Sequence, residues 1–139
     1  RKESSAASDV YKRQLQLDDR LQMLGTLKNP YPYVKSADFF ILPSKTESYP
    51  LILGETLCLG VPIISTNVGG ISEMIDDEVD GVLIQADENE IYQAMRRFLT
   101  DHELVNRLKQ NAQLAYQKFD KQIIYSQVTE TFEKLYNEH

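Results

Sequence analysis

The sequence predicts an α/β domain in which helices cover both faces of a parallel sheet. Three short apolar runs, at residues 38–42, 62–65 and 82–84, alternate with segments of helical pattern. The runs are almost continuously apolar, which is typical of strands buried on both faces. From Asn89 onward, apolar residues recur only at helical spacing. We therefore expect a Rossmann-like sheet followed by a helical C-terminus.

The first third of the chain contains two predicted strands and one short helix. Leu21–Leu24 is apolar and is followed by Gly25, so we expect a short strand there. Residues 30–36 predict a helix, because proline suits a first helical position. Residues 38–42 predict a strand buried on both faces, which Pro43 stops.

The next segments continue the alternation. Residues 51–59 are too long and too leucine-rich for another strand, and Gly60 suits the end of a helix. Residues 62–65 are short and β-branched, which predicts a strand. Gly69–Gly70 predicts a tight turn into a short helix, and residues 82–84 predict a further core strand.

Three amphipathic stripes end the chain. Their apolar residues are Ile91, Ala94, Met95, Phe98 and Leu99; Leu104, Leu108, Ala112 and Ala115; and Ile123, Ile124, Val128, Phe132 and Leu135. Each set follows helical spacing and predicts one helix.

Three regions are expected along the 139 residues. Residues 1–14 are polar, without a period, and similar to translated adapter sequence; we expect a non-native or disordered leader. Residues 15–118 form the predicted domain, and residues 119–139 its C-terminal helix. This length suits one domain or part of a larger enzyme.

Composition excludes several classes of function. The net charge is −6 without a Lys/Arg cluster, which argues against binding to nucleic acid. No run of about 18 apolar residues could span a membrane, and the N-terminus lacks the apolar segment of a signal peptide. The single Cys58 cannot form an internal disulfide, which favours a reducing, cytoplasmic compartment.

Two carboxylates eight positions apart, Glu47 and Glu55, are the main candidates for a site. The spacing alone is weak, because Glu130 and Glu138 share it. The context is stronger: Glu47 lies in a loop after a predicted strand, and Glu55 lies inside an apolar helix. Ligands of parallel sheets bind at the carboxyl ends of the strands, which is where that loop lies.

The start of the predicted helix offers donors for phosphate. Pro50 fits its first turn, so the amides of Leu51 and Ile52 would face the loop. Glu55, about one turn further, suits two neighbouring hydroxyls such as a ribose diol, and Glu47 would lie near the sugar or its anomeric carbon. The alternative is structural: Glu55 caps a backbone group or pairs with an arginine, and Glu47 is a helix-start acid.

Ser44, Lys45, Gly69 and Gly70 are weaker candidates. Ser44 opens the loop of Glu47. Lys45 would reach a phosphate, although a solvated loop lysine is the commoner role. The amides at Gly69 and Gly70 would contact the ligand, unless that segment is only a turn. No Cys/His spacing, Walker loop or Ser/His/Asp set occurs, so we expect neither a metal nor a cofactor.

As a set, these motifs closely resemble the GT4 family of glycosyltransferases, also called glycosyl transferases group 1. The resemblance covers residues 15–118 and rests on 24–25, 37–44, 47–55, 60–64 and 69–75. It implies the donor-binding, C-terminal domain of a GT-B fold. It also implies a retaining transfer from a nucleotide-diphosphate sugar without a catalytic metal.

The resemblance assigns roles by position. Glu47 would be the catalytic glutamate beside the donor sugar, and Glu55 would bind the ribose hydroxyls. The backbone at Tyr49 would contact the sugar, and the amides of Leu51 and Ile52 would face the diphosphate. Gly54 departs from the aliphatic residue that is commoner in relatives.

The resemblance also implies partners that lie outside this chain. An upstream Arg/Lys pair and an acceptor-binding N-terminal domain would be missing, so the chain alone should be almost inactive. Residues 119–139 would cross to that domain, which would bind an acceptor glycan or a lipid-linked sugar. We expect a hexosyltransferase of cell-surface polysaccharide or glycolipid synthesis, cytoplasmic or at the inner face of the membrane.

Two other functions remain open on the sequence alone. One is a nucleotide-sugar epimerase of the same fold, although the acids and histidine expected of that class form no such set here. The other is a non-catalytic α/β interaction domain, in which both glutamates are structural.

Overall fold

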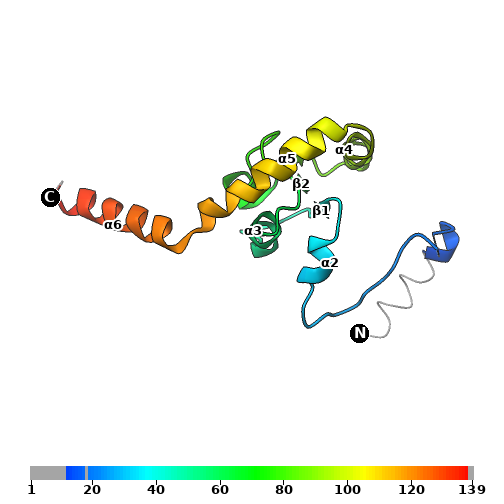
Figure 1. The fold of residues 1–139 in the computed structure, drawn as a ribbon, viewed down its shortest axis with the longest axis horizontal. Coiled ribbons are helices and arrows are strands. Elements are labelled where there is room, and N and C mark those ends of the chain that lie inside the picture. Colours follow the sequence, from blue (N-terminus) through cyan, green and yellow to red (C-terminus); the bar gives the residue numbers. More distant parts are fainter. Residues whose placement is uncertain (1–11, 18, 138–139) are drawn as a thin grey trace. The chain divides into compact units, whose positions relative to one another are not determined.

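A computed structural model describes residues 12–17 and 19–137 of the chain (Figure 1). Its contacts define two units, Arg1–Pro30 and Tyr31–His139, and each is described by itself. Most of the predicted leader, residues 1–11, lies outside the described residues; residues 12–14 form one helical turn.

The strand predicted at Leu21–Leu24 is wrong. Residues 21–25 are irregular, and the described sheet has three strands, none of them from this segment. Leu21, Met23 and Leu24 are 43%, 56% and 39% exposed. An apolar run becomes a strand only where another strand accepts its backbone hydrogen bonds, and no described strand pairs with this one.

The sheet is parallel and consists of β1 (Phe40–Leu42), β2 (Ile63–Thr66) and β3 (Gly81–Ile84), in that spatial order. Ile41 pairs with Ile64, which pairs with Val82. The central β2 is buried along its whole length. β1 was expected to be buried on both faces, but it is only half-buried at one edge of the described sheet. β3 lies at the other edge and is mostly buried, because the helix of residues 88–100 packs against it.

Alternation along the strands produces two cores, as a sheet covered on both faces requires. On one face, Ile63 packs with residues of α3 (Leu51–Cys58), η1 (Gly69–Glu73) and α5 (His102–Ala115). On the other face, Ile64 packs with residues of α4 (Glu88–Thr100) and α5. The predicted fold class is therefore confirmed.

The helices that flank β1 match the sequence pattern. α2 (Tyr31–Lys35) precedes β1, and α3 follows its loop. α3 ends in a Schellman motif: Gly60, at φ +72°, donates its N–H to Leu57 O (2.8 Å), and Val61 donates to Thr56 O (3.2 Å). The helix therefore stops where the sequence predicted.

Aspartates fix the starts of the C-terminal helices. Asp87 accepts from the Asn89 and Glu90 amides at the start of α4, and Asp101 accepts from Leu104 N (2.9 Å) in α5. A 3-10 turn, η2 (Tyr116–Phe119), leads from α5 into α6 (Lys121–Asn137). The helical C-terminus was predicted correctly.

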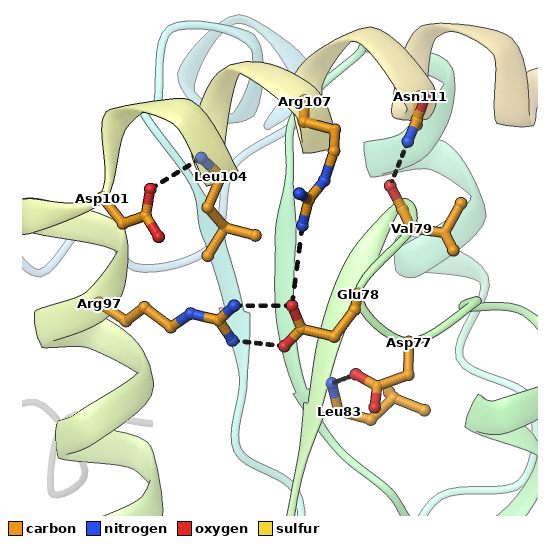
Figure 2. A network of polar contacts seen from close by, with 9 residues as sticks. All are labelled: Asp77, Glu78, Val79, Leu83, Arg97, Asp101, Leu104, Arg107 and Asn111. Carbon is orange, nitrogen blue, oxygen red and sulfur yellow. Dashed lines mark hydrogen bonds and ion pairs between the residues drawn. The ribbon is translucent and has the colours of Figure 1, made fainter.

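The turn before β3 is clamped to two helices (Figure 2). Glu78 has a left-handed backbone (φ +61°) that a non-glycine residue rarely adopts. Its carboxylate forms a two-pronged ion pair with Arg97 of α4, and Arg107 of α5 lies 3.9 Å away. Asn111 of α5 donates to Val79 O (2.8 Å). These contacts hold the turn in its strained conformation.

Lys118 anchors η2 to the same turn. Its Nζ lies 2.6 Å from both the exposed Asp76 and the buried Asp80. Partial burial opposes the charge of Lys118, but the hydrogen bonds to both carboxylates outweigh it and raise the pKa of Lys118. Beyond this anchor, the apolar residues of α6 are exposed, for example Val128 (46%) and Phe132 (68%).

Candidate functional site

The loop after β1 is fixed from the end of β2. Thr66, buried at the last position of β2, donates its hydroxyl to Ser44 O at 2.6 Å. Ser44 in turn donates its own hydroxyl to Glu47 Oε1 at 2.7 Å. Two adjacent parallel strands thus orient Glu47 at their carboxyl ends, where the sequence placed the site.

The Gly69–Gly70 segment packs against the backbone of this loop. A Cβ atom on Gly69 would lie 1.8 Å from Glu47 O, and one on Gly70 would lie 2.5 Å from Ser48 O. Gly70 N also donates to Ser48 O (2.9 Å). Both glycines are therefore needed for this close approach of two loops, whatever ligand the amides meet.

The N-terminus of α3 follows the loop directly. Pro50 is its N-cap, without a side-chain cap, and its carbonyl accepts from Leu53 N (3.0 Å). The amides of Leu51 and Ile52 come before Leu53, the first intrahelical donor, so the helix itself offers them no acceptor, as at the start of any helix. They provide donors and a positive dipole end beside Glu47.

One face of α3 lines an apolar pocket of about 410 Å³. The residues from α3 and its C-cap are Leu51, Gly54, Glu55, Cys58 and Leu59, and the other lining residues are Tyr31, Tyr49, Met74 and Phe119. The spacing i, i+3, i+4, i+7, i+8 is that of one helix face. The opposite face, with Leu53 and Leu57, is fully buried in the core. Among the described residues that line the pocket, Glu55 is the only carboxylate.

Glu55 accepts a hydrogen bond from Tyr31 of α2, with 3.0 Å between the hydroxyl and Oε1. Glu55 is half-buried, and among the described residues it forms no ion pair. The arginine partner of the structural alternative is therefore not found there. The hydrogen bond that Tyr31 donates to Glu55 raises the pKa of Tyr31, and the negative charge of Glu55 raises it further.

Gly54 makes room for an aromatic ring. A Cβ atom at this position would lie 3.2 Å from Phe119 Cε1. Phe119 belongs to η2, so the turn that leads into α6 also forms a wall of the pocket. This contact accounts for a glycine inside α3, where relatives more often have an aliphatic residue and where glycine weakens a helix.

The structure brings most of the predicted site residues together in two adjoining groups. Ser44, Glu47, Gly69 and Gly70 form the loop cluster. Tyr49, Leu51 and Glu55 line the pocket. Of the remaining two candidates, Lys45 is exposed in the loop between Ser44 and Glu47. Ile52 is half-buried, and its predicted role rests on its backbone amide and not on its side chain.

Sequence reasoning missed Tyr31, Met74, Cys58 and Phe119 as pocket residues. Tyr31 carried a weak signal, since it begins a short helix between two prolines. Its partner lies 24 positions away, a distance at which no periodicity applies.

Two further properties concern metals and membranes. Over residues 12–17 and 19–137, no three His, Cys, Asp or Glu side chains are grouped to hold a metal ion. Over the same residues, no helix has the length and apolar character needed to cross a bilayer.

Comparison with known proteins places the chain in a family. Residues 6–115 match the family described as glycosyl transferases group 1. The chain belongs to this family. Its structure has the fold of GT-B glycosyltransferase domains, so the family predicted from the motifs is confirmed.

Curated relatives match over much of this chain but over a small part of their own length. An N-acetylgalactosaminyltransferase of Campylobacter jejuni that acts on a diphospho-undecaprenol is 30% identical over 78% of the chain and 30% of the relative. The N-acetyl-alpha-D-glucosaminyl L-malate synthase of Bacillus anthracis is 32% identical over 83% of the chain and 31% of the relative. The chain thus spans less than a third of either relative.

Solved structures match a larger share of this chain than the curated relatives do. Sucrose-phosphate synthase of Thermosynechococcus elongatus has a TM-score of 0.77 and 25% identity, over 94% of this chain and 34% of that protein. Anabaena HepE in complex with UDP has a TM-score of 0.81 and 23% identity, over 95% of this chain and 38% of HepE.

Proposed function

We propose that this chain is the donor-binding part of a retaining glycosyltransferase. Its substrate is a nucleotide-diphosphate sugar, from which the sugar passes to an acceptor glycan or a lipid-linked sugar. The observation that carries the proposal is the position of Glu55. A single carboxylate, held by a neutral hydroxyl, lines an apolar pocket beside a helix N-terminus.

The roles follow from the chemistry of each group. The Leu51 and Ile52 amides suit the diphosphate, and Glu55, about one turn away, suits the ribose diol. Glu47 and the backbone at Tyr49 lie in the loop just before the same helix and suit the sugar. In the transfer, the bond from the anomeric carbon to the diphosphate oxygen breaks, and the acceptor hydroxyl oxygen bonds to that carbon with the same configuration. The hydroxyl proton passes to the departing diphosphate.

The relatives support this substrate class. HepE was solved with UDP and with UDP-glucose. The name of the Campylobacter protein specifies a lipid-linked acceptor, and an Escherichia coli relative, 30% identical over 73% of this chain, is a UDP-Gal-dependent transferase with such an acceptor. We therefore propose a role in cell-surface polysaccharide or glycolipid synthesis, at the cytoplasmic face of the membrane.

The chain alone should transfer sugar poorly. A cationic group that stabilises the leaving diphosphate and the acceptor-binding domain are both expected upstream. Loss of such electrostatic stabilisation removes several kcal/mol of rate acceleration. In an assay with UDP-, GDP- and ADP-sugars and lipid-linked acceptors, we expect negligible turnover; turnover like that of a complete relative would contradict this part of the proposal.

Binding tests the donor site directly. The chain is titrated calorimetrically with UDP, GDP and ADP, alongside Glu55→Gln and the matched control Glu133→Gln on an exposed part of α6. We expect one nucleotide to bind, about tenfold more weakly in Glu55→Gln and unchanged in Glu133→Gln. Equal binding by Glu55→Gln, or no binding by the folded chain, would contradict the proposal. A structural role of Glu55 would instead appear as lower stability with unchanged affinity.

A further inference from the structure

We infer that Tyr31 is a positioning residue for the donor site: it holds Glu55 in the orientation that receives the ribose hydroxyls. The inference rests on the proposed function and assigns a new residue to it. Tyr31 lies on α2, before β1, and Glu55 lies on α3, after β1. The fold brings them together across 24 positions of sequence.

Tyr31 and Glu55 line the same pocket. The hydroxyl of Tyr31 therefore approaches the carboxylate from within the wall of the proposed site. Tyr33, on the same short helix, is similarly exposed (51%, against 42% for Tyr31) but does not line the pocket. The two tyrosines of α2 therefore differ in their relation to the site.

The hydroxyl of Tyr31 is a neutral partner for Glu55. A lysine or arginine would neutralise Glu55 and compete with a ligand hydroxyl for its oxygens. A tyrosine hydroxyl donates one hydrogen bond to Oε1 and leaves the charge on the carboxylate. An ionised carboxylate has about four acceptor sites on its two oxygens, so Glu55 can keep Tyr31 and still accept from a diol.

Tyr31 also affects the conformational entropy that the Glu55 side chain loses on binding. A glutamate side chain loses rotamer freedom when a ligand fixes it, and this loss weakens binding. A tyrosine has only two side-chain torsions and brings its hydroxyl on a rigid ring. A hydrogen bond from Tyr31 restricts the rotamers of Glu55 before the nucleotide binds. Less side-chain freedom is then lost on binding.

The test compares three single variants and one double variant: Tyr31→Phe, Tyr33→Phe, Glu55→Gln and Tyr31→Phe with Glu55→Gln. Each is titrated with the nucleotide that binds the unmodified chain and with its 2′,3′-dideoxy form. We expect Tyr31→Phe to weaken the ribonucleotide about tenfold and the dideoxy form less than twofold. Tyr33→Phe should match the unmodified chain, and the double variant should bind no more weakly than Glu55→Gln.

A spectroscopic titration of tyrosinate absorbance checks the contact in the free protein. The pKa of Tyr31, identified by difference against Tyr31→Phe, should lie above that of an ordinary tyrosine and fall in Glu55→Gln. Because unfolding would also return the pKa of Tyr31 to its ordinary value, the circular dichroism of Glu55→Gln must match that of the unmodified chain for the shift to count.

The failures of the inference and of the proposed function are distinct. If Glu55→Gln weakens binding but Tyr31→Phe does not, the inference is wrong and the donor site stands. Tighter binding by Tyr31→Phe would show that the hydroxyl competes with the ligand, and equal loss for both nucleotides would show a role of the ring alone; both overturn the inference. If Glu55→Gln binds normally, the proposed function itself fails.

Discussion

The α-carbon of Gly69 lies directly against the carbonyl oxygen of Glu47, so that a Cβ atom there would stand 1.8 Å from it. Gly69 also has a left-handed backbone, at φ +58°. The segment after β2 therefore fixes the backbone of the loop that carries Glu47. No substitution can preserve both the turn and the loop.

Gly69→Ala should displace the loop of Glu47. A clash of this size, added to the left-handed backbone, should lower the free energy of unfolding by about 3 kcal/mol or more and abolish nucleotide binding. The matched control is Gly25→Ala, since Gly25 is also left-handed (φ +65°) but has nothing within 4 Å of its added Cβ. It should cost only about 1 kcal/mol; equal effects in denaturant unfolding would refute the packing argument.

Gly54 and Phe119 should behave as a coupled pair. Gly54→Ala gains about 1 kcal/mol of helix propensity, but its Cβ would press on the Phe119 ring at 3.2 Å. The substitution should therefore be nearly neutral in the unmodified chain and stabilising by about 1 kcal/mol when Phe119 is replaced by Leu. Denaturant unfolding of the double-mutant cycle checks this, and additive effects would count against the contact.

The ion pairs of Glu78 with Arg97 and Arg107 and the left-handed backbone of Glu78 should both affect the stability of the chain. Glu78→Gln removes the ion pairs to Arg97 and Arg107, which are partly exposed (side chains 42% and 57%), and should cost about 1 kcal/mol. Glu78→Gly also removes them but relieves the left-handed strain, so it should be more stable than Glu78→Gln. Raising the salt concentration should shrink the cost of Glu78→Gln. If the loss of unfolding free energy in Glu78→Gln did not depend on salt, these ion pairs would not stabilise the turn by charge.

Lys118 should stabilise the chain in a pH-dependent way. Lys118→Met leaves the buried Asp80 without its cationic partner and should cost about 2 kcal/mol near neutral pH; the partly exposed Lys109→Met should cost little. Because the folded-state pKa of Lys118 is raised, its contribution is complete below the pKa of the unfolded chain. It is lost as the pH rises through the folded-state pKa. A difference between variant and unmodified chain that stays constant to high pH would contradict this linkage.

Local patterns predicted most elements of this fold. Residues 51–59 and Gly60 gave α3 and its end because both follow from short-range rules on composition and left-handed glycine. The pattern at Leu21–Leu24 failed because a strand requires a pairing partner, which local sequence does not show. The same holds for β1: its apolar sequence fits full burial, but its half-burial at one edge of the described sheet is a property of the tertiary fold.

The site was predicted in part for the same reason. Glu47 and Glu55 could be found because strand, loop and helix follow one another directly in sequence. The Tyr31–Glu55 hydrogen bond, the Phe119 wall and the contact of Gly69 with Glu47 join distant segments. No periodicity connects such segments, so only the three-dimensional structure shows that these residues meet.

The most direct measurement is a crystal structure of the chain with whichever of UDP, GDP or ADP it binds. We expect a ribose hydroxyl within hydrogen-bond distance, about 2.5–3.0 Å, of the Glu55 carboxylate, and the diphosphate at the amides of Leu51 and Ile52. A nucleotide bound elsewhere, or bound here with Glu55 turned away from the ribose, would contradict the proposed donor site.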